Sequence, residues 1–293
     1  MTGRRLVGLI GANIGGSLSP ALHEDAFAAA GMTGHYHLMD IDTLPERRLE
    51  ELLAAARTAG FAGVNITHPF KQAVIPLLDS LSPEAAEIGA VNTVVIDAAG
   101  RTMGHNTDRS GFRRAFVESL GAEGARDRPV LLLGSGGAGR AVAFALMDLG
   151  VGLLKVYDRD AARSTGLCAD LAARFGAGRC ELLAEPEVAA GSAAGIVNTT
   201  PVGMRGYPGV PIAARLIQSR HFVADVIYTP LETELVKAAR GRGARAMGGG
   251  GMCVHQAAEA FRVFTGLDPD IRRMHATFAA AAALRDKALA EAD

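Results

Sequence analysis

The sequence has no tryptophan, only 5% aromatic residues and only three cysteines in 293 residues. Its 30 basic and 31 acidic residues nearly cancel, so charge favours neither nucleic acid nor an anionic membrane as a partner. No apolar run approaches the roughly 20 residues that span a bilayer. Cys168, Cys180 and Cys253 form no CxxC pair, which argues against a disulfide framework or a zinc site and fits a reducing cytoplasm. We therefore expect a cytoplasmic protein whose partners are small molecules.

Apolar residues, in contrast, are abundant. The chain is 49% hydrophobic with a mean hydropathy of +0.18, enough at this length for two compact domains. The opening "MTGRRLVGLIGANIGG" has an apolar run that Gly11 and Asn13 interrupt after a few residues. We interpret it as a first strand and not as a signal peptide.

Strand-like and helix-like patterns alternate from the beginning of the chain. Their order, in "RLVGLIG", "SPALHEDAFAAAG", "HYHLMDID", "LPERRLEELLAAARTAG", "GFAGVNIT" and "KQAVIPLLD", predicts an α/β fold with a largely parallel sheet. Gly31, Gly60 and Gly150 follow helical stretches, where a left-handed C-terminal cap favours glycine. Residues 89–108 predict a hairpin with a turn at Ala98 to Arg101.

A second αβ region begins at "PVLLLGSGGAGRAVAFALMDLG", after a polar stretch that is the candidate domain boundary. Four further strand-like segments follow it, in "LLKVYDRD", "RCELL", "GIVNTT" and "FVADVIY". From "GMCVHQ" onward the pattern is helical, and we expect these last helices to return to the first domain.

The glycine-rich turn in this second region is a candidate nucleotide site. Four glycines lie between an apolar strand and a helix, at Gly134, Gly136, Gly137 and Gly139. Glycines there let the backbone approach a pyrophosphate at the helix N-terminus, although a merely tight turn would show the same pattern.

Asp158 ends the next strand about 20 residues further on, where a carboxylate binds ribose hydroxyls and repels a 2′-phosphate. It therefore favours NAD over NADP. Arg159 argues the other way because it can pair with a phosphate, and Asp158 could also be an ordinary turn residue.

Polar clusters occur at four predicted strand ends of the first region. They contain Ser17, Ser19 and His23; Asn65, Thr67 and Lys71; Asn92 and Thr93; and Asn106, Thr107 and Asp108. Such strand ends line the ligand crevice of open α/β sheets, and hydroxyls with amides suit a polyhydroxylated ligand. A lysine beside a carboxylate can relay the proton that an alcohol loses as hydride leaves its carbon.

Structural roles compete with these functional ones. Ser19 before Pro20 is typical of a helix N-cap, and Lys71 alone would be a solvated helix residue. Asn92 and Asn106 could brace the hairpin. His23 and His68 have no evident metal or nucleophile partner, so we interpret them as structural.

Together the clusters resemble the shikimate dehydrogenase family over nearly the whole chain. The motifs occur in family order: "SLSPALH", "NITHPFK", "GAVNTV", "GHNTDRSGF", "GSGGAGRA", "NTTPVGM", "DVIYTPLETELVKAA" and "GMCVHQAAEAF". Glu24 and Asp158 make the chain most similar to the NAD-preferring quinate/shikimate dehydrogenases. Two departures, "GANIGG" and "MGGGGMCVHQ", lie beside the expected substrate and nicotinamide positions.

The resemblance implies a two-lobed α/β fold. Residues 1–110 with 251–293 would form the substrate-binding and catalytic domain, completed by the C-terminal helices, and residues 111–250 a Rossmann-type NAD(P)-binding domain. The chain would be a monomer or a homodimer.

The resemblance also implies the site residues. Lys71 and Asp108 would be the catalytic pair. The substrate would contact Ser17, Ser19, Thr67, Lys71, Asn92, Asp108, Tyr228 and Gln256. The cofactor would contact Gly134, Gly136, Gly137, Ala138, Gly139, Asp158, Arg163, Thr200, Pro201, Val226, Gly249 and Met252.

The implied reaction is hydride transfer between C3 of quinate or shikimate and NAD, giving 3-dehydroquinate or 3-dehydroshikimate, with no metal. Two alternatives stay open. One is an NADP-dependent biosynthetic shikimate dehydrogenase, and the other is a non-catalytic regulatory protein that senses quinate.

Overall fold

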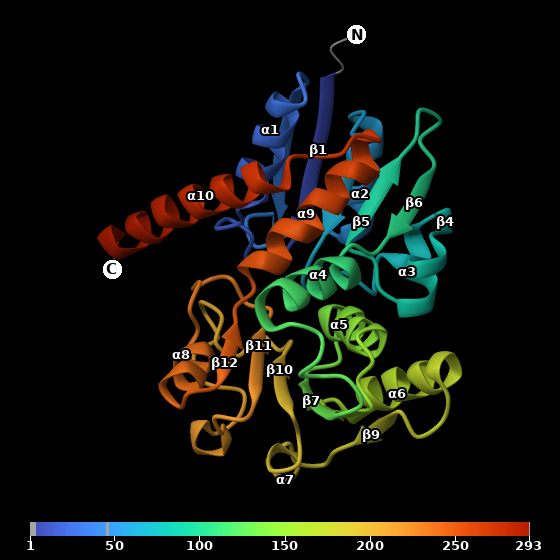
Figure 1. Cartoon of the computed structure of the whole chain (residues 1–293). Helices are drawn as coiled ribbons and strands as arrows, with labels where there is room; N and C mark the ends of the chain where they lie inside the picture. The colour runs from blue at the N-terminus through green and yellow to red at the C-terminus, as the bar shows by residue number, and fades with distance from the viewer. Residues whose placement is uncertain (1–3, 45–46, 293) are drawn as a thin grey trace. The chain divides into compact units, whose positions relative to one another are not determined.

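A computed structural model describes residues 4–44 and 47–292. The chain divides into two compact units, Met1–Thr107 with Val254–Asp293, and Asp108–Cys253. Each unit is built on a six-stranded sheet (Figure 1). Among the described residues, no helix is long and apolar enough to cross a membrane.

The sheet of the first unit is mixed, with strand order β2-β1-β3-β5-β6-β4. Its strands are β1 (Arg4–Gly11), β2 (Thr33–Asp40), β3 (Gly63–Ile66), β4 (Ser80–Leu81), β5 (Thr93–Ile96) and β6 (Thr102–His105). β1 pairs in parallel with β2 and β3, whereas β5 runs antiparallel to β3 and β6. The β5–β6 pair is the predicted hairpin.

Helices cover both faces of this sheet. They are α1 (Ser19–Ala29), α2 (Leu49–Thr58), α3 (Pro83–Ile88), α9 (Gly250–Thr265) and α10 (Ile271–Ala292), with a 3₁₀ turn η1 at Ile75–Leu77. The return of the C-terminal helices to the first unit is confirmed, since the chain from Val254 onward belongs to it. Asp25 of α1 accepts two hydrogen bonds from Arg273 of α10, at 2.8 and 2.6 Å.

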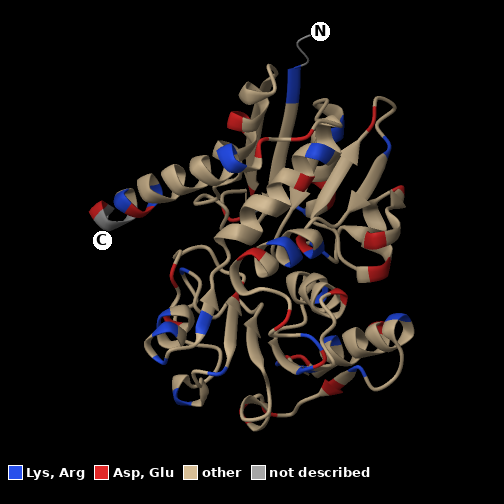
Figure 2. Ribbon diagram, viewed as in Figure 1, with Lys and Arg blue, Asp and Glu red and all other residues tan. Residues whose placement is uncertain are grey.

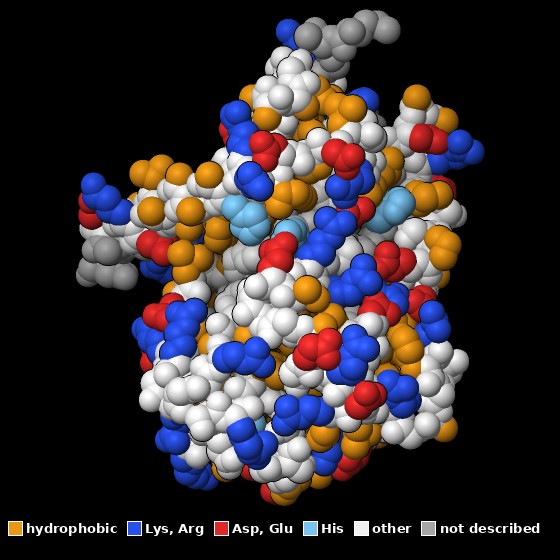
Figure 3. Space-filling view, viewed as in Figure 1, with side chains coloured by type: hydrophobic (Ala, Val, Ile, Leu, Met, Phe, Trp, Pro, Cys, Tyr) orange, Lys and Arg blue, Asp and Glu red, His pale blue; other side chains and the backbone are white. Residues whose placement is uncertain are grey.

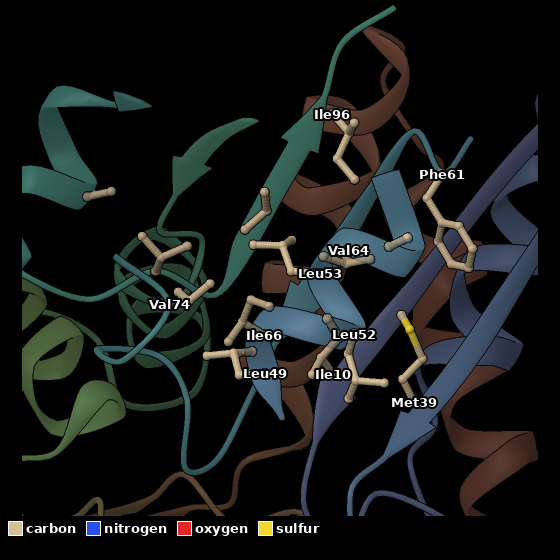
Figure 4. Packing of buried hydrophobic residues seen from close by; sticks show 14 residues of the cluster. Ile10, Met39, Leu49, Leu52, Leu53, Phe61, Val64, Ile66, Val74 and Ile96 are labelled. Atoms are coloured by element: carbon tan, nitrogen blue, oxygen red, sulfur yellow. The ribbon is translucent and has the colours of Figure 1, made fainter. Parts of the chain in front are cut away.

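Alternating side chains of the strands supply two apolar cores, one on each face of the sheet. Val7 and Leu9 of β1 pack in the cluster that contains Phe27 of α1 and Phe261 of α9. Ile10 belongs to the other cluster, under α2 (Figure 4). That second cluster contains Ile10, Met39, Leu49, Leu52, Leu53, Ala56, Phe61, Val64, Ile66, Val74, Ala85, Val91, Val94 and Ile96.

The sheet of the second unit is wholly parallel, with order β12-β11-β10-β7-β8-β9. Its strands are β7 (Pro129–Leu133), β8 (Leu153–Tyr157), β9 (Cys180–Leu182), β10 (Gly195–Asn198), β11 (Phe222–Asp225) and β12 (Arg245–Met247). Its helices are α4 (Asp108–Leu120), α5 (Gly137–Asp148), α6 (Ala161–Phe175), α7 (Glu187–Ala190), η2 (Ala214–Leu216) and α8 (Glu234–Gly241). This is the strand order of a Rossmann-type sheet.

The left-handed helix ends are confirmed: φ is +68° at Gly31, +76° at Gly60 and +83° at Gly150. The strand β12 was not predicted, because three residues that include Arg245 give too short an apolar pattern. β4, with two residues, was missed for the same reason.

The helix predicted after β3 is wrong. Residues 71–74 form turns, followed only by the 3₁₀ turn η1. Pro76 has no N–H to continue a helical ladder. The carbonyl of Lys71 accepts instead from the Val91 amide, at 2.7 Å. Tertiary pairing has therefore replaced the helical hydrogen bond.

The expectation for the cysteines is also wrong, because Cys168 and Cys180 form a disulfide with a Cα–Cα distance of 5.4 Å. Gly176 and Gly178, both with positive φ, let the chain reverse so that β9 begins beside α6. Cys253 is buried. The cytoplasmic location stays a prediction, and the disulfide removes one of its arguments.

Basic and acidic residues are interspersed along the ribbon of each unit (Figure 2). On the face that Figure 3 shows, blue and red side chains alternate and no large patch of one sign is visible. Surface charge therefore gives no electrostatic guide to a polyanionic partner on this face.

Candidate active site

The proposed substrate groups of the first unit follow the ends of its central strands. Thr67 comes directly after β3, and its amide donates to the Ile10 carbonyl at 3.0 Å. Gly11 ends β1 so close to it that a Cβ on Gly11 would lie 2.3 Å from Thr67 Cγ2. Glycine at this position therefore lets the two strand ends approach each other.

Asn92 is a buried junction of this region. Its Oδ1 accepts from the Thr107 amide at 2.8 Å, and its Nδ2 donates to Thr107 Oγ1 at 2.9 Å. The same Nδ2 lies 3.5 Å from Gln256 Oε1 of α9. Asn106 Nδ2 donates to the Ala90 carbonyl at 2.9 Å. Both asparagines therefore brace the hairpin, and Asn92 also joins it to a helix from the other end of the chain.

Asn65 extends this network toward β2. Its Oδ1 accepts from the Tyr36 hydroxyl at 2.8 Å, and its Nδ2 donates to Thr93 Oγ1 at 2.9 Å. A side-chain amide has two N–H donors and an oxygen that can accept two hydrogen bonds, and burying any of these without a partner costs free energy. The hydrogen bonds of Asn65 lower that cost. The network links the middle of β2 to β3 and to the start of β5.

Ser17 and Ser19 enter from the loop between β1 and α1. Leu18 is the N-cap of α1 and Ser19 its first residue, so the N-cap role considered for Ser19 is wrong. Ser17 Oγ instead accepts from the Ser19 amide, at 3.3 Å. Ser19 is buried and Ser17 half-buried.

The two proposed catalytic residues differ in setting. Lys71 is half-buried in the turns after β3. Asp108 is only 3% exposed and is the first residue of α4 and of the second unit, directly after Thr107 in the chain. A carboxylate in the first turn of a helix is stabilised by the helix dipole.

The two histidines that we interpret as structural lie in different environments. His23 is buried, and its ring stacks on that of Tyr36 with 4.8 Å between centroids. Burial lowers the pKa of His23 to about 3, so the ring is neutral at physiological pH. His68 is exposed, and its carbonyl accepts from the Ala12 amide at 2.9 Å.

In the second unit the glycine-rich turn joins β7 to α5. Gly134 has φ +95°, and a Cβ on Gly139 would lie 2.3 Å from the Gly134 carbonyl oxygen. A Cβ on Gly136 would meet no described atom within 4 Å, so the outer side of the turn is open. A backbone turn that is closed inside and open outside, at a helix N-terminus, fits the pyrophosphate of a dinucleotide.

Asp158 follows β8 and is held by the same turn. Its Oδ2 accepts from the Ser135 amide at 2.7 Å and from Ser135 Oγ at 2.8 Å, and its Oδ1 accepts from the Asp160 amide at 2.9 Å. Burial alone would raise the pKa of Asp158, but hydrogen bonds from the Asp160 and Ser135 amides outweigh it and hold the pKa below its usual value. The carboxylate is ionised and its orientation fixed.

The two arginines near Asp158 are exposed. Arg163 lies on α6, and its Nε is 3.1 Å from Asp160 Oδ2. Arg159 lies in the loop between β8 and α6. Asp160 therefore offsets part of the positive charge that a 2′-phosphate would require.

The other proposed cofactor residues follow β10 and β11 or lie where α9 begins. Thr200 and Pro201 come after β10, Val226 after β11, and Gly249 with Met252 at the start of α9. Tyr228, proposed for the substrate, is half-buried in the loop after β11.

Sequence reasoning missed the groups that hold these loops. Ser135, Asn198 and Asp225 each hydrogen-bond a loop that carries a proposed cofactor residue. Their signal was their position at predicted strand ends, in segments whose glycines or apolar pattern had been considered but whose polar side chains had not.

A surface hollow of about 410 Å³ lies elsewhere in the second unit. It is lined by Arg113, Arg114, Val117, Glu118, Ala122, Arg126, Asp148 and Leu149. The proposed substrate and cofactor residues are not among these, and the arginines that line it are exposed. We interpret it as a solvated helix face.

Two family models match this chain: the shikimate dehydrogenase substrate binding domain over residues 9–94, and the shikimate 5′-dehydrogenase C-terminal domain over residues 249–277. A quinate/shikimate dehydrogenase (NAD⁺) of Corynebacterium efficiens is 47% identical over 277 residues, covering 93% of this chain and 97% of the relative. The chain belongs to the shikimate dehydrogenase family.

Other members of the shikimate dehydrogenase family differ in the cofactor that they are named for. A shikimate dehydrogenase (NADP⁺) of Streptomyces avermitilis is 49% identical over 280 residues, covering 94% of each chain. The solved structure of quinate dehydrogenase from Corynebacterium glutamicum in complex with NAD has a TM-score of 0.86 and 44% identity, covering 95% of this chain and all of that one. The family is therefore clear, while its members span both nicotinamide cofactors.

Proposed function

We propose that this protein is an NAD-dependent quinate/shikimate dehydrogenase, which interconverts the C3 hydroxyl of its substrate and the corresponding ketone. The observation that carries the proposal is the ionised Asp158 at the end of β8, held beside a glycine turn that suits a pyrophosphate. When bound there, NAD would accept the hydride from C3. The first unit would bind the substrate and the second the cofactor.

Lys71 and Asp108 are proposed to act on the reacting oxygen. In the oxidation direction, Lys71 Nζ takes the hydroxyl proton as C3 loses its hydride, and in the reduction direction it returns that proton. The Asp108 carboxylate can only accept hydrogen bonds, so we assign it the role of holding the Lys71 nitrogen toward that oxygen. The amides and hydroxyls of Asn92, Thr67 and Ser17 match the donors and acceptors of a polyhydroxylated ring.

Initial rates with quinate and shikimate, each with NAD and NADP, test the proposal. We expect reduction of NAD with at least one of the two substrates. A catalytic efficiency higher with NADP than with NAD would favour the alternative of an NADP-dependent shikimate dehydrogenase. That alternative has the support of Arg159, Arg163 and the Streptomyces relative.

Lys71→Ala tests the proton relay. Removing a general acid–base group lowers kcat by about 10² to 10⁴-fold. Lys237→Ala is the matched control, since Lys237 is exposed and pairs with Glu234 at 2.9 Å on α8. Turnover near the wild-type value in Lys71→Ala would show that the role assigned to Lys71 is wrong.

A further inference from the structure

Three polar side chains at the carboxyl ends of β10 and β11 are completely buried. Asn198, Asp225 and Thr233 each have 0% exposure. Burying a carboxylate is costly unless its oxygens accept hydrogen bonds. None of the three is among the proposed contacts of substrate or cofactor, so ligand binding does not explain why these polar side chains are buried.

The Asp225 carboxylate joins three segments. Its Oδ1 accepts from Asn198 Nδ2 and from the Ile227 amide, both at 3.1 Å. Its Oδ2 accepts from Thr233 Oγ1 at 2.7 Å. Thr233 in turn caps α8, because its Oγ1 accepts from the Val236 amide at 3.3 Å. The carboxylate thus ties the end of β10, the turn after β11 and the start of α8.

Asn198 passes this restraint to the loop after β10. Its Oδ1 accepts from the amide and the hydroxyl of Thr200, at 3.0 and 2.7 Å. Its Nδ2 also donates to the Val202 carbonyl at 3.2 Å, and Thr200 Oγ1 accepts from the Val202 amide at 3.2 Å. The backbone on both sides of Pro201 is therefore held by one amide side chain.

The turn after β11 sets the position of Gly249. The Gly249 amide donates to the Ile227 carbonyl at 3.0 Å. A Cβ on Gly249 would lie 2.2 Å from the Val226 carbonyl oxygen, so the two backbones are in direct contact. A displacement of Val226 and Ile227 would move Gly249 and the first turn of α9 with them.

The ionised form of Asp225 suits this arrangement, because all three of its partners are donors and a carboxylate only accepts. Burial raises the pKa of Asp225 to about 6, against the opposing effect of the bonds from Thr233, Ile227 and Asn198. The group is therefore mostly charged at neutral pH.

We propose that Asp225 is a positioning residue of the dinucleotide site, which through Asn198 and Thr233 holds the loops of Pro201, Val226 and Gly249 in the shape that receives NAD. This proposal rests on the proposed function, because it takes those three residues to line the cofactor. Asp225 itself touches neither substrate nor cofactor.

Asp225→Asn tests it. The variant places an amide NH₂ against groups that donated hydrogen bonds to the carboxylate, so these bonds are lost. We expect KM for NAD to rise by about tenfold or more, while KM for quinate or shikimate stays within twofold of the wild-type value. Val223→Ala is the matched control, because Val223 is also fully buried in β11 but packs in the apolar core. It should lower stability and leave KM for NAD unchanged.

Thr233→Val and Thr233→Ser form a second, milder pair in case Asp225→Asn does not fold. Valine removes the donor to Asp225, whereas serine keeps it, so KM for NAD should rise in the first and return toward wild type in the second. A KM for NAD unchanged in Thr233→Val, or raised equally in Val223→Ala, would overturn the proposal.

Amide hydrogen exchange distinguishes a failure of this proposal from a failure of the proposed function. Faster exchange at residues 199–204 and 226–230 in Asp225→Asn, with Val223→Ala as the reference, would support the positioning role even if the wild type oxidised neither substrate. Unchanged exchange there would overturn it, whereas an inactive wild type alone would contradict only the assigned activity.

Discussion

In the first unit the proposed ligand groups are side chains, and they are amides and hydroxyls that also bond to one another through Asn65 and Asn92. In the second unit the groups proposed for the cofactor are largely backbone at Gly134 to Gly139, together with the carboxylate of Asp158. The difference suits the ligands proposed for each unit. A polyhydroxylated ring needs many neutral donors and acceptors, whereas a pyrophosphate needs close backbone approach.

A large effect on NAD affinity is expected from closing the backbone approach in the second unit. Gly139→Ala places a Cβ 2.3 Å from the Gly134 carbonyl oxygen, so the turn must move. We expect NAD affinity, measured by fluorescence titration, to fall by at least about tenfold, since one misplaced hydrogen-bonded contact costs that much.

Gly166→Ala is the control for this change. Gly166 lies within α6, and a Cβ there would meet no described atom within 4 Å. Alanine should raise the free energy of unfolding by about 0.5–1 kcal/mol and leave NAD affinity unchanged. Wild-type NAD affinity in Gly139→Ala would contradict the idea that backbone approach matters in this unit.

A comparable effect, on the substrate and not on NAD, is expected from Asn92→Ala in the first unit. The change leaves the buried Thr107 amide without its acceptor, which costs about 1–3 kcal/mol of stability. We expect kcat/KM for quinate or shikimate to fall by about tenfold or more while NAD affinity stays within twofold. Equal losses for substrate and NAD would show that the two units do not divide the binding as proposed.

The smallest expected effect is a pH dependence of the first unit, caused by His23. Its pKa is lowered from 6.5 to about 3 by burial, so below pH 6.5 the unfolded chain binds a proton that the folded chain does not. Stability therefore falls as the pH drops from 7 to 5, with His23 contributing a loss of about 2 kcal/mol.

His23→Phe keeps a ring against Tyr36 and removes the titrating group. Urea unfolding at pH 7 and pH 5 should show a smaller loss of stability in this variant than in the wild type. Hydrogen exchange should assign the wild-type loss to the first unit. An identical loss in both proteins would show that His23 is not its source.

The sequence predicted most of this fold because its long apolar runs and glycine helix ends are local signals. It failed where distant groups decide the local structure. The segment after β3 forms turns because Val91 pairs with Lys71, and β12 forms from three residues because β11 lies beside it. The disulfide between Cys168 and Cys180 depends on the chain reversal at two glycines, which the spacing of the cysteines does not show.

The sequence by itself determined the two αβ units, the glycine turn, Asp158 at the end of its strand and the order of motifs that marks the family. These are properties of neighbouring residues, whose periodicity and backbone freedom act over a few positions. Only the tertiary structure decided what holds those groups: Ser135 on Asp158, Thr107 on Asn92, and the buried bonds of Asp225 to Asn198 and Thr233. Hydrogen bonds between side chains far apart in the chain exist only after folding has removed water from them, and linear spacing does not encode them.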